Sequence, residues 1–310
     1  MNYLVLAKAY QELESTSKRL HKTKIVSNLL KKTDESIIDK VVLLLKGKVF
    51  PSSDTQDLGI SNKLLLKAIS LVTGFTTSKL EDEWRKTGDL GVVTQNLFKS
   101  KSQSTLFSET LTVDKVFDTL RKLSLTEGKG STDQKIKLVS NLLSSASSIE
   151  AKYIVRTVLL DLRVGVATAA LRDAIAWTYL VDPNYDDNTH SINPDREKYN
   201  EILEIVQSAL DKTNDYALTA KLASKGINTL KEVKMKIGNP INVMLAKKTE
   251  INSVFKDVGS PCALEYKLDG FRMQIQKQND KVIIFTRRLE DVTAQFPDVV
   301  KIINNNERRK

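Results

Sequence analysis

The sequence predicts a multidomain α+β protein, in which an all-α N-terminal domain is followed by the first β-strands of a second domain. Two observations lead to this prediction. Residues 1–235 carry apolar side chains at helical spacing, separated by capping and breaking residues. After Gly226 the pattern changes, and residues 263–286 alternate apolar and polar side chains, as strands do. We therefore predict one domain over residues 1–235 and another over residues 236–310.

Composition places the chain among ordinary soluble proteins, because 41% of its 310 residues are hydrophobic and 28% are charged. Its apolar runs are too short to cross a membrane, and the N-terminus lacks the basic and apolar regions of a signal peptide. We expect a cytoplasmic monomer without a membrane partner. One cysteine excludes an intrachain disulfide, and one cysteine with two histidines argues against a zinc site. The net charge of +10 favours an anionic partner such as nucleic acid.

The helices of the first domain are predicted from their caps and apolar stripes. Ser61 is expected to cap one helix, and the pairs Ser131/Gln134 and Ser147/Glu150 have capping-box spacing. Thr168 is expected to cap another helix, after a helix that ends near residues 162–165. The apolar stripes lie at residues 6–20, 37–45, 64–71 and 136–146.

The second domain centres on residues 263–272, Ala-Leu-Glu-Tyr-Lys-Leu-Asp-Gly-Phe-Arg. A strand over residues 263–268 would have an apolar face and a charged face, since successive side chains point in opposite directions. Asp269-Gly270 would then turn the chain into a strand over residues 271–276, and a third strand would cover residues 282–286. The apolar face would hold Leu264, Tyr266 and Leu268, and the charged face Glu265, Lys267 and Asp269.

A plain hairpin with solvated charges would explain Lys-x-Asp-Gly alone, which arises by chance in roughly one such chain in ten. The longer pattern Glu-x-Lys-x-Asp-Gly-x-Arg, from Glu265 to Arg272, arises by chance in roughly one in several thousand. It resembles the nucleotidyl-lysine motif of ATP-dependent DNA ligases, RNA ligases and mRNA capping enzymes. The resemblance implies that Lys267 attacks the α-phosphate of a nucleotide.

The same resemblance implies the nucleotide-binding residues and the cofactors. Glu265 would contact the adenine edge, Arg272 the sugar-phosphate side and Arg287 the phosphate region, with ATP and Mg²⁺ as cofactors. Arg288 would point the opposite way from Arg287. Nearby carboxylates raise the pKa of a lysine, so Mg²⁺ and neighbouring arginines would have to oppose them. We expect no metal ligands within this chain.

Parts of the helical region resemble the DNA-binding domain of archaeal and eukaryotic DNA ligases. They are residues 88–91, Gly-Asp-Leu-Gly, and the stretch 156–177. The resemblance implies candidates for DNA contact in two loops. Structural explanations stay open for each segment. Residues 88–91 would form a turn between two helices, residues 128–131 a plain linker, and Gly165 a C-cap with Arg163 as a surface charge. The DNA-binding candidates are Lys129, Gly130, Ser131, Arg163 and Gly165.

Residues 103–107, Gln-Ser-Thr-Leu-Phe, resemble the segment with which archaeal ligases dock on a ring-shaped sliding clamp. The candidate clamp-binding residues are Gln103, Leu106 and Phe107. Packing of Leu106 and Phe107 on their own domain is the alternative. Leu106 also stands where a strong clamp motif has a second aromatic residue.

The leading hypothesis is therefore an ATP-dependent DNA ligase of archaeal type, nucleoid-associated in an archaeon, whose substrate is nicked double-stranded DNA. We predict its DNA-binding domain and the beginning of its nucleotidyltransferase (adenylation) domain. The family's later motifs and its OB-fold would follow residue 310, so these residues alone can lack activity. Two alternatives stay open: a non-catalytic DNA-binding fragment, and another nucleotidyl-lysine enzyme, either an RNA ligase or a capping enzyme.

Overall fold

A computed structural model describes residues 1–51, 54, 56–99, 110–243, 246 and 248–305. They form two compact units, Met1–Lys234 and Met235–Lys310. No helix within these ranges is both long and apolar enough to cross a membrane.

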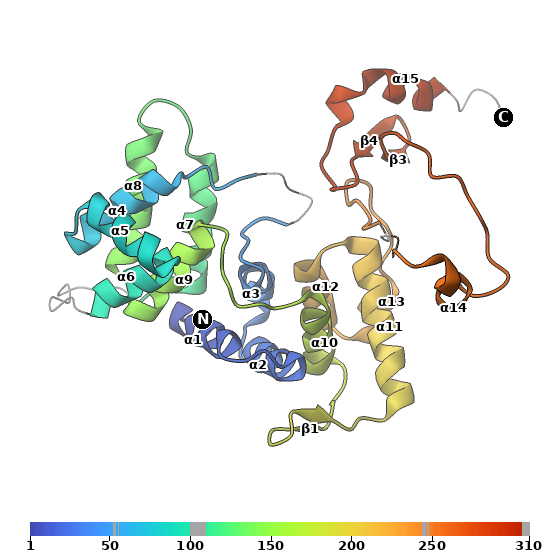
Figure 1. Ribbon diagram of the computed structural model, residues 1–310, viewed down its shortest axis with the longest axis horizontal. Coiled ribbons are helices and arrows are strands. Elements are labelled where there is room, and N and C mark those ends of the chain that lie inside the picture. Colours follow the sequence, from blue (N-terminus) through green and yellow to red (C-terminus); the bar gives the residue numbers. More distant parts are fainter. Residues whose placement is uncertain (52–53, 55, 100–109, 244–245, 247, 306–310) are drawn as a thin grey trace. The chain divides into compact units, whose positions relative to one another are not determined.

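The first unit is built mainly from helices (Figure 1). They pack around one continuous apolar core, in which the side chains of Tyr3, Tyr10 and Tyr153 are fully buried. The prediction that the N-terminal region is helical is thus confirmed. Its elements are α1 (Tyr3–Glu14), α2 (Arg19–Lys31), η1 (Glu35–Ile37), α3 (Ile38–Leu45), α4 (Asn62–Thr73), α5 (Thr77–Thr87), α6 (Leu90–Lys99), α7 (Val113–Leu125), α8 (Ser131–Ser144), α9 (Ser148–Val158), α10 (Thr168–Tyr179), α11 (Arg196–Thr213), α12 (Tyr216–Ala223) and α13 (Ile227–Lys231).

Two of the predicted helix caps are confirmed. The Ser61 side chain accepts a hydrogen bond from the Leu64 amide, and Ser147 forms the expected capping box with Glu150. The box predicted at Ser131 is wrong, because α8 starts one residue earlier than the pattern suggested. Its N-cap is Gly130 in a left-handed conformation, and Ser131 is already helical.

The α9–α10 connection also differs from prediction. Helix α9 ends at Val158 rather than near residues 162–165, and Thr168 is the first residue of α10 instead of its cap. The N-cap is Ala167, which has no side-chain acceptor. A short antiparallel hairpin was also not predicted, since two-residue strands are too short to show alternation. It consists of β1 (Tyr185–Asp186) and β2 (Ser191–Ile192).

The second unit contains η2 (Ile251–Ser253), α14 (Val254–Val258), β3 (Gln274–Gln278), β4 (Lys281–Phe285), η3 (Thr293–Gln295) and α15 (Pro297–Asn305). Strands β3 and β4 form an antiparallel hairpin, so the second and third predicted strands are confirmed with small shifts of their ends. Its core face buries Val282 and Ile284 with Val292, against apolar side chains of α15. Pro297 begins α15, as its fixed φ favours.

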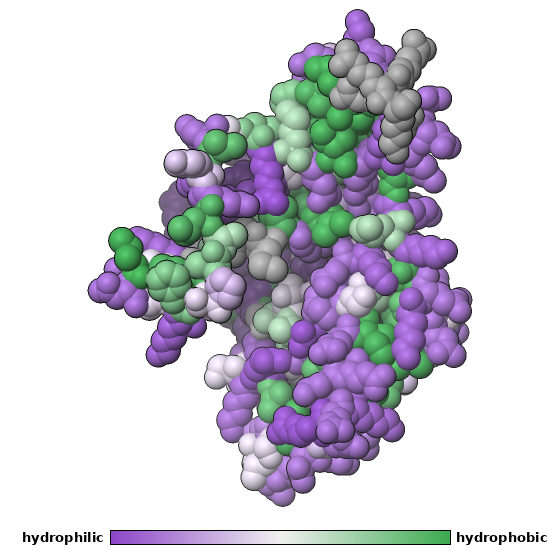
Figure 2. Space-filling model, turned by 90° about the vertical axis from the view of Figure 1, so that its right-hand side faces the viewer, coloured by the Kyte–Doolittle hydropathy of each residue, from purple (hydrophilic) through white to green (hydrophobic). Residues whose placement is uncertain are grey.

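The strand predicted over residues 263–268 is wrong, because these residues have no regular secondary structure. The Asp269-Gly270 turn is wrong too: the hairpin turns at Asn279-Asp280, between β3 and β4. A strand needs a partner for its backbone and a layer over its apolar face. Within the described residues the second unit's sheet has only β3 and β4, and Tyr266 is 96% exposed. Apolar side chains on the molecular surface are green in Figure 2.

Candidate functional site

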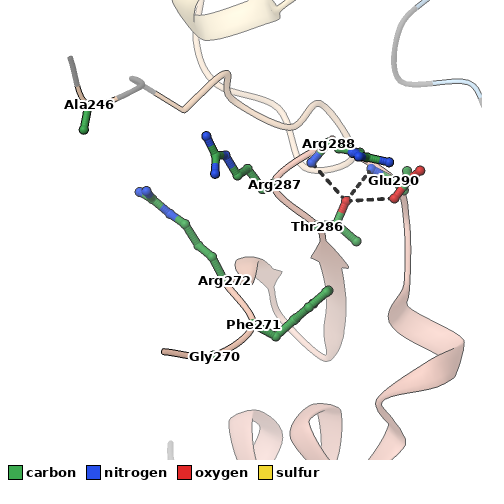
Figure 3. A pocket seen from close by; sticks show the side chains of 8 residues that line it. All are labelled: Ala246, Gly270, Phe271, Arg272, Thr286, Arg287, Arg288 and Glu290. Carbon is green, nitrogen blue, oxygen red and sulfur yellow. Dashed lines mark hydrogen bonds between the residues drawn. The ribbon is translucent and has the colours of Figure 1, made fainter. Parts of the chain in front are cut away.

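A pocket of about 600 Å³ lies in the second unit (Figure 3). Arg272 and Arg287, both predicted to bind nucleotide, lie in its wall. The side chains of these two residues extend toward the same open side, whereas Arg288 and Glu290 point the other way (Figure 3). The lining residues are Ala246, Gly270, Phe271, Arg272, Thr286, Arg287, Arg288 and Glu290.

The β3–β4 hairpin brings the two arginines together. Gln274 pairs with Phe285 across the hairpin. Arg272 lies two residues before Gln274, and Arg287 two residues after Phe285, so both lie at the same end of the hairpin, and their side chains extend to the same side (Figure 3). The chain just before β3 is anchored by Phe271, whose ring stacks on Phe296 at 5.5 Å between centroids.

A tight turn orients Arg287 and Arg288. The Leu289 amide donates to the Thr286 carbonyl at 2.9 Å, which places the two arginines at the centre of the turn. The Thr286 hydroxyl accepts from the Arg288 amide at 3.1 Å and donates to the Glu290 carboxylate at 3.1 Å. The side chains of Arg287 and Arg288 were predicted to point in opposite directions because they would lie on a strand. They do point in opposite directions, but the cause is this turn.

The pocket is strongly basic on the side of Arg272 and Arg287. Two guanidiniums extend there together. Such a pair fits the oxygens of a phosphate or polyphosphate through paired hydrogen bonds. The described residues include no group of three or more histidines, cysteines or carboxylates that could hold a metal ion.

The structure does not bring Lys267 or Glu265 into the pocket lining. Both lie in the exposed stretch that replaces the predicted strand. Gly270 of the same motif does line the pocket. Three residues of chain span at most about 10 Å, so Lys267 is within reach of the pocket after a local rearrangement. The roles of Lys267, Glu265, Arg272 and Arg287 stay predictions.

The first candidate DNA-binding loop, residues 126–130, leads into α8. Lys129 and Gly130 are exposed and Ser131 is half-buried. Gly130 has a φ of 81°, and no atom comes within 4 Å of a side chain built there. The Ser131 amide donates to the Gly128 carbonyl at 3.2 Å, which closes the turn that leads into α8.

The second candidate loop joins α9 to α10 and holds Arg163 in a left-handed conformation, with φ of 56°. The side chain of Arg163 is 45% exposed, and its guanidinium pairs with Asp161 at 2.6 Å. Lys22, which the sequence did not single out, donates to the carbonyls of Val164 and Gly165 at 2.8 and 3.0 Å. No local pattern could reveal it, because it lies on α2, far along the chain.

Residues 88–91 form a structural junction. Gly88 ends α5 in a left-handed conformation, and the Asp89 side chain accepts from the Val92 amide at the start of α6. Asp89 also binds the buried guanidinium of Arg156 at 2.6 Å. A side chain at Gly91 would meet Arg156 Cγ at 2.7 Å and the Lys152 carbonyl at 2.8 Å, so the glycine allows α6 to contact α9. The predicted turn is confirmed.

The candidate clamp-binding residues Gln103, Leu106 and Phe107 lie outside the described residues. The sequence analysis missed Ala246 and Phe271 in the pocket wall. It also missed Gln274 and Gln276, although glutamines at alternate positions of a strand are an unusual enough pattern to be noticed.

Comparisons with known proteins identify the family. A family model described as DNA ligase N terminus matches residues 2–176, and one described as ATP dependent DNA ligase domain matches residues 243–310. A DNA ligase of Methanobrevibacter smithii is 39% identical over 306 residues, which cover 98% of this chain and 52% of that protein. A DNA ligase of Saccharolobus shibatae is 40% identical over 315 residues, covering 98% and 49% respectively.

A third relative, a DNA ligase of Thermococcus fumicolans, is 36% identical over 310 residues. The helical unit and the arginine pocket thus occur in a chain that matches ligases along nearly all its length. The chain belongs to the ATP-dependent DNA ligase family. It spans about half the length of the curated relatives it matches.

Proposed function

We propose that the protein acts as an ATP-dependent DNA ligase, which seals nicks between a 5′-phosphate and a 3′-hydroxyl in duplex DNA during replication, repair and recombination. The observation that carries this proposal is the arginine-lined pocket at the end of the Glu265–Arg272 motif. The relatives are DNA ligases, which favours this function over an RNA ligase or a capping enzyme.

In the proposed reaction, Lys267 Nζ attacks the α-phosphorus of ATP and displaces pyrophosphate. The 5′-phosphate at the nick then attacks the lysyl-AMP phosphorus, which releases Lys267. Finally the 3′-hydroxyl attacks the 5′-phosphorus, and AMP leaves. Glu265 would orient the adenine, while Arg272 and Arg287 neutralise phosphate charge; positioning and charge neutralisation dominate such transfers.

Mg²⁺ would enter with the nucleotide. This ion is commonly held by substrate phosphates, waters and one or two carboxylates rather than by a full protein cage.

The helical unit would hold the DNA. We assign phosphate contacts to Lys129, Gly130 and Ser131 at the start of α8, and to Arg163 and Gly165 in the α9–α10 loop. The exposure of Lys129, Arg163 and Gly165 in these loops supports this assignment.

Incubation with α-labelled ATP and Mg²⁺, followed by denaturing electrophoresis, tests the proposal. We expect wild type to retain label and Lys267→Ala to lose it, whereas Lys256→Ala, an exposed lysine of α14, keeps it. Preferential labelling by GTP would support a capping enzyme instead. An unlabelled wild type that still binds nicked DNA would support the non-catalytic alternative.

We also propose a sliding-clamp contact through Gln103, Leu106 and Phe107, made by a monomeric ligase. Leu106→Ala combined with Phe107→Ala should weaken clamp binding and leave duplex affinity unchanged, measured by surface plasmon resonance. Equal clamp binding by wild type and the double variant would refute this assignment.

A further inference from the structure

Two glutamines of β3 bind the backbone of residues 238–241. Gln276 Oε1 accepts from the Gly238 amide at 2.7 Å, and Gln276 Nε2 donates to the Asn239 carbonyl at 2.7 Å. Gln274 Oε1 accepts from the Ile241 amide at 2.8 Å, and its Nε2 donates to the Ile241 carbonyl at 3.1 Å. Each carboxamide thus uses its donor and its acceptor, as a peptide group of a neighbouring strand would.

The two side chains can act together because residues two apart in a strand share a face. Their cross-strand neighbours on that face are Phe285 and Ile283. The opposite face of the hairpin is covered by α15. Segment 238–241 therefore covers the face that α15 leaves open, and a side chain built at Gly238 would lie 3.9 Å from Ile283 Cδ1.

This bonding joins β3 to a segment that precedes one wall of the arginine pocket in the chain. Arg272 lies in the chain that leads into β3, two residues before Gln274. Ala246 lies five residues after Ile241 and lines the same pocket. Five residues of chain reach at most about 17 Å, so the anchor at Ile241 restricts where Ala246 can lie.

We propose that Gln274 and Gln276 are positioning residues for nucleotide binding. They hold segment 238–241, and through it the Ala246 wall, opposite Arg272 and Arg287. This inference rests on the proposed function, because it takes the nucleotide to occupy the arginine pocket. Without the carboxamides the wall must be ordered when the nucleotide binds, and that ordering lowers affinity.

The test compares Gln274→Met/Gln276→Met with wild type, since methionine keeps the length of the side chain and cannot make these hydrogen bonds. Gln278→Met is the matched control, because Gln278 is an exposed glutamine on the same face of β3. Three measurements are made on the full chain: the Kd for MgATP by calorimetry, amide exchange in peptides covering residues 236–246, and circular dichroism. We expect the Kd to rise about tenfold and exchange to accelerate, with helical content unchanged. The control should match wild type.

A second variant, Gln276→Glu, removes the hydrogen bond to the Asn239 carbonyl and keeps the size of the side chain, so its effect can be distinguished from misfolding. Glutamate still accepts from the Gly238 amide but places a carboxylate against the Asn239 carbonyl, so we expect faster exchange and a smaller rise in Kd. Faster exchange with an unchanged Kd would overturn the positioning role, and unchanged exchange would overturn the anchoring itself. A wild type that binds no MgATP would contradict the proposed function, while exchange over residues 238–246 would still decide whether the glutamines anchor the segment.

Discussion

At the scale of single residues, one buried arginine links three parts of the helical unit. The side chain of Arg156 on α9 is 3% exposed. It donates to Glu14 of α1 at 3.0 Å and to Asp89, between α5 and α6, at 2.6 Å. Removing one partner of a buried pair leaves the other charges without compensation, which costs more than the pair itself contributes.

We therefore expect Arg156→Ala to lower the free energy of unfolding by about 3–5 kcal/mol, measured by urea denaturation. The control is Arg85→Ala on α5, where an exposed ion pair contributes at most about 1 kcal/mol. Equal midpoints for the two variants would contradict a structural role for the buried network.

Glu14 makes this network sensitive to acid. Burial alone would raise the pKa of Glu14, but hydrogen bonds from Arg156, Lys152 and Tyr153 outweigh burial and lower the pKa from 4.5 to about 2. A carboxyl with a lowered pKa stabilises the fold above its unfolded pKa, and that stability is lost as the pH falls through the folded pKa.

Stability should therefore fall between about pH 5 and pH 2, partly through Glu14. In Glu14→Gln this part of the loss should be missing, so that the variant is less stable at neutral pH and shows a shallower acid limb. Thermal unfolding from pH 2 to pH 7 measures both. Parallel curves for the two proteins would exclude Glu14 as a contributor.

At the scale of elements, the contact between α6 and α9 depends on Gly91. A methyl group there would lie within 2.8 Å of the Lys152 carbonyl, which belongs to the backbone and cannot rotate away. Close packing of this kind leaves no room for even one carbon atom.

Gly91→Ala should destabilise the fold by about 1–3 kcal/mol, although alanine favours a helix more than glycine does. The control is Gly74→Ala at the C-cap of α4, where a side chain would have open space around it. There the only cost is the strain of a left-handed conformation, about 1 kcal/mol of the free energy of unfolding. Denaturation midpoints of both variants provide the comparison. A Gly91→Ala protein as stable as wild type would show that α6 and α9 can separate without cost.

At the scale of the whole molecule, the proposed DNA contacts are electrostatic and should depend on salt. Residues 236–310 hold 14 lysines and arginines against 9 aspartates and glutamates, so half of the net charge of +10 lies in the smaller unit. Contacts to phosphates release counterions, and log affinity then falls linearly with log salt concentration.

Lys129→Ala should reduce the slope of that plot by about 1 and weaken binding to all duplex sequences alike. The measurement is fluorescence anisotropy with a nicked duplex. The salt concentration varies from about 50 to about 200 mM, a range over which such slopes can be determined. The control is Lys86→Ala, which removes an exposed lysine of α5. An unchanged slope for Lys129→Ala would remove this loop from the proposed DNA surface.

The sequence by itself determined the helical unit, the approximate places of strands β3 and β4, and the family. Helical spacing, caps such as Ser61, and strand alternation depend on neighbours a few residues away, so a local pattern suffices. The Glu265–Arg272 motif is long enough to be specific, and its likeness to ligases led to the same family as the comparisons.

Only the tertiary structure decided what depends on partners distant in the sequence. Residues 263–268 have the alternation of a strand but no neighbouring strand within the described residues, so they are exposed. Arg156 donates hydrogen bonds to Glu14 and Asp89, and Lys22 donates to the carbonyls of Val164 and Gly165. Two glutamines of β3 bind the backbone of segment 238–241. Such contacts form between groups that folding brings together, and no local spacing of residues encodes them.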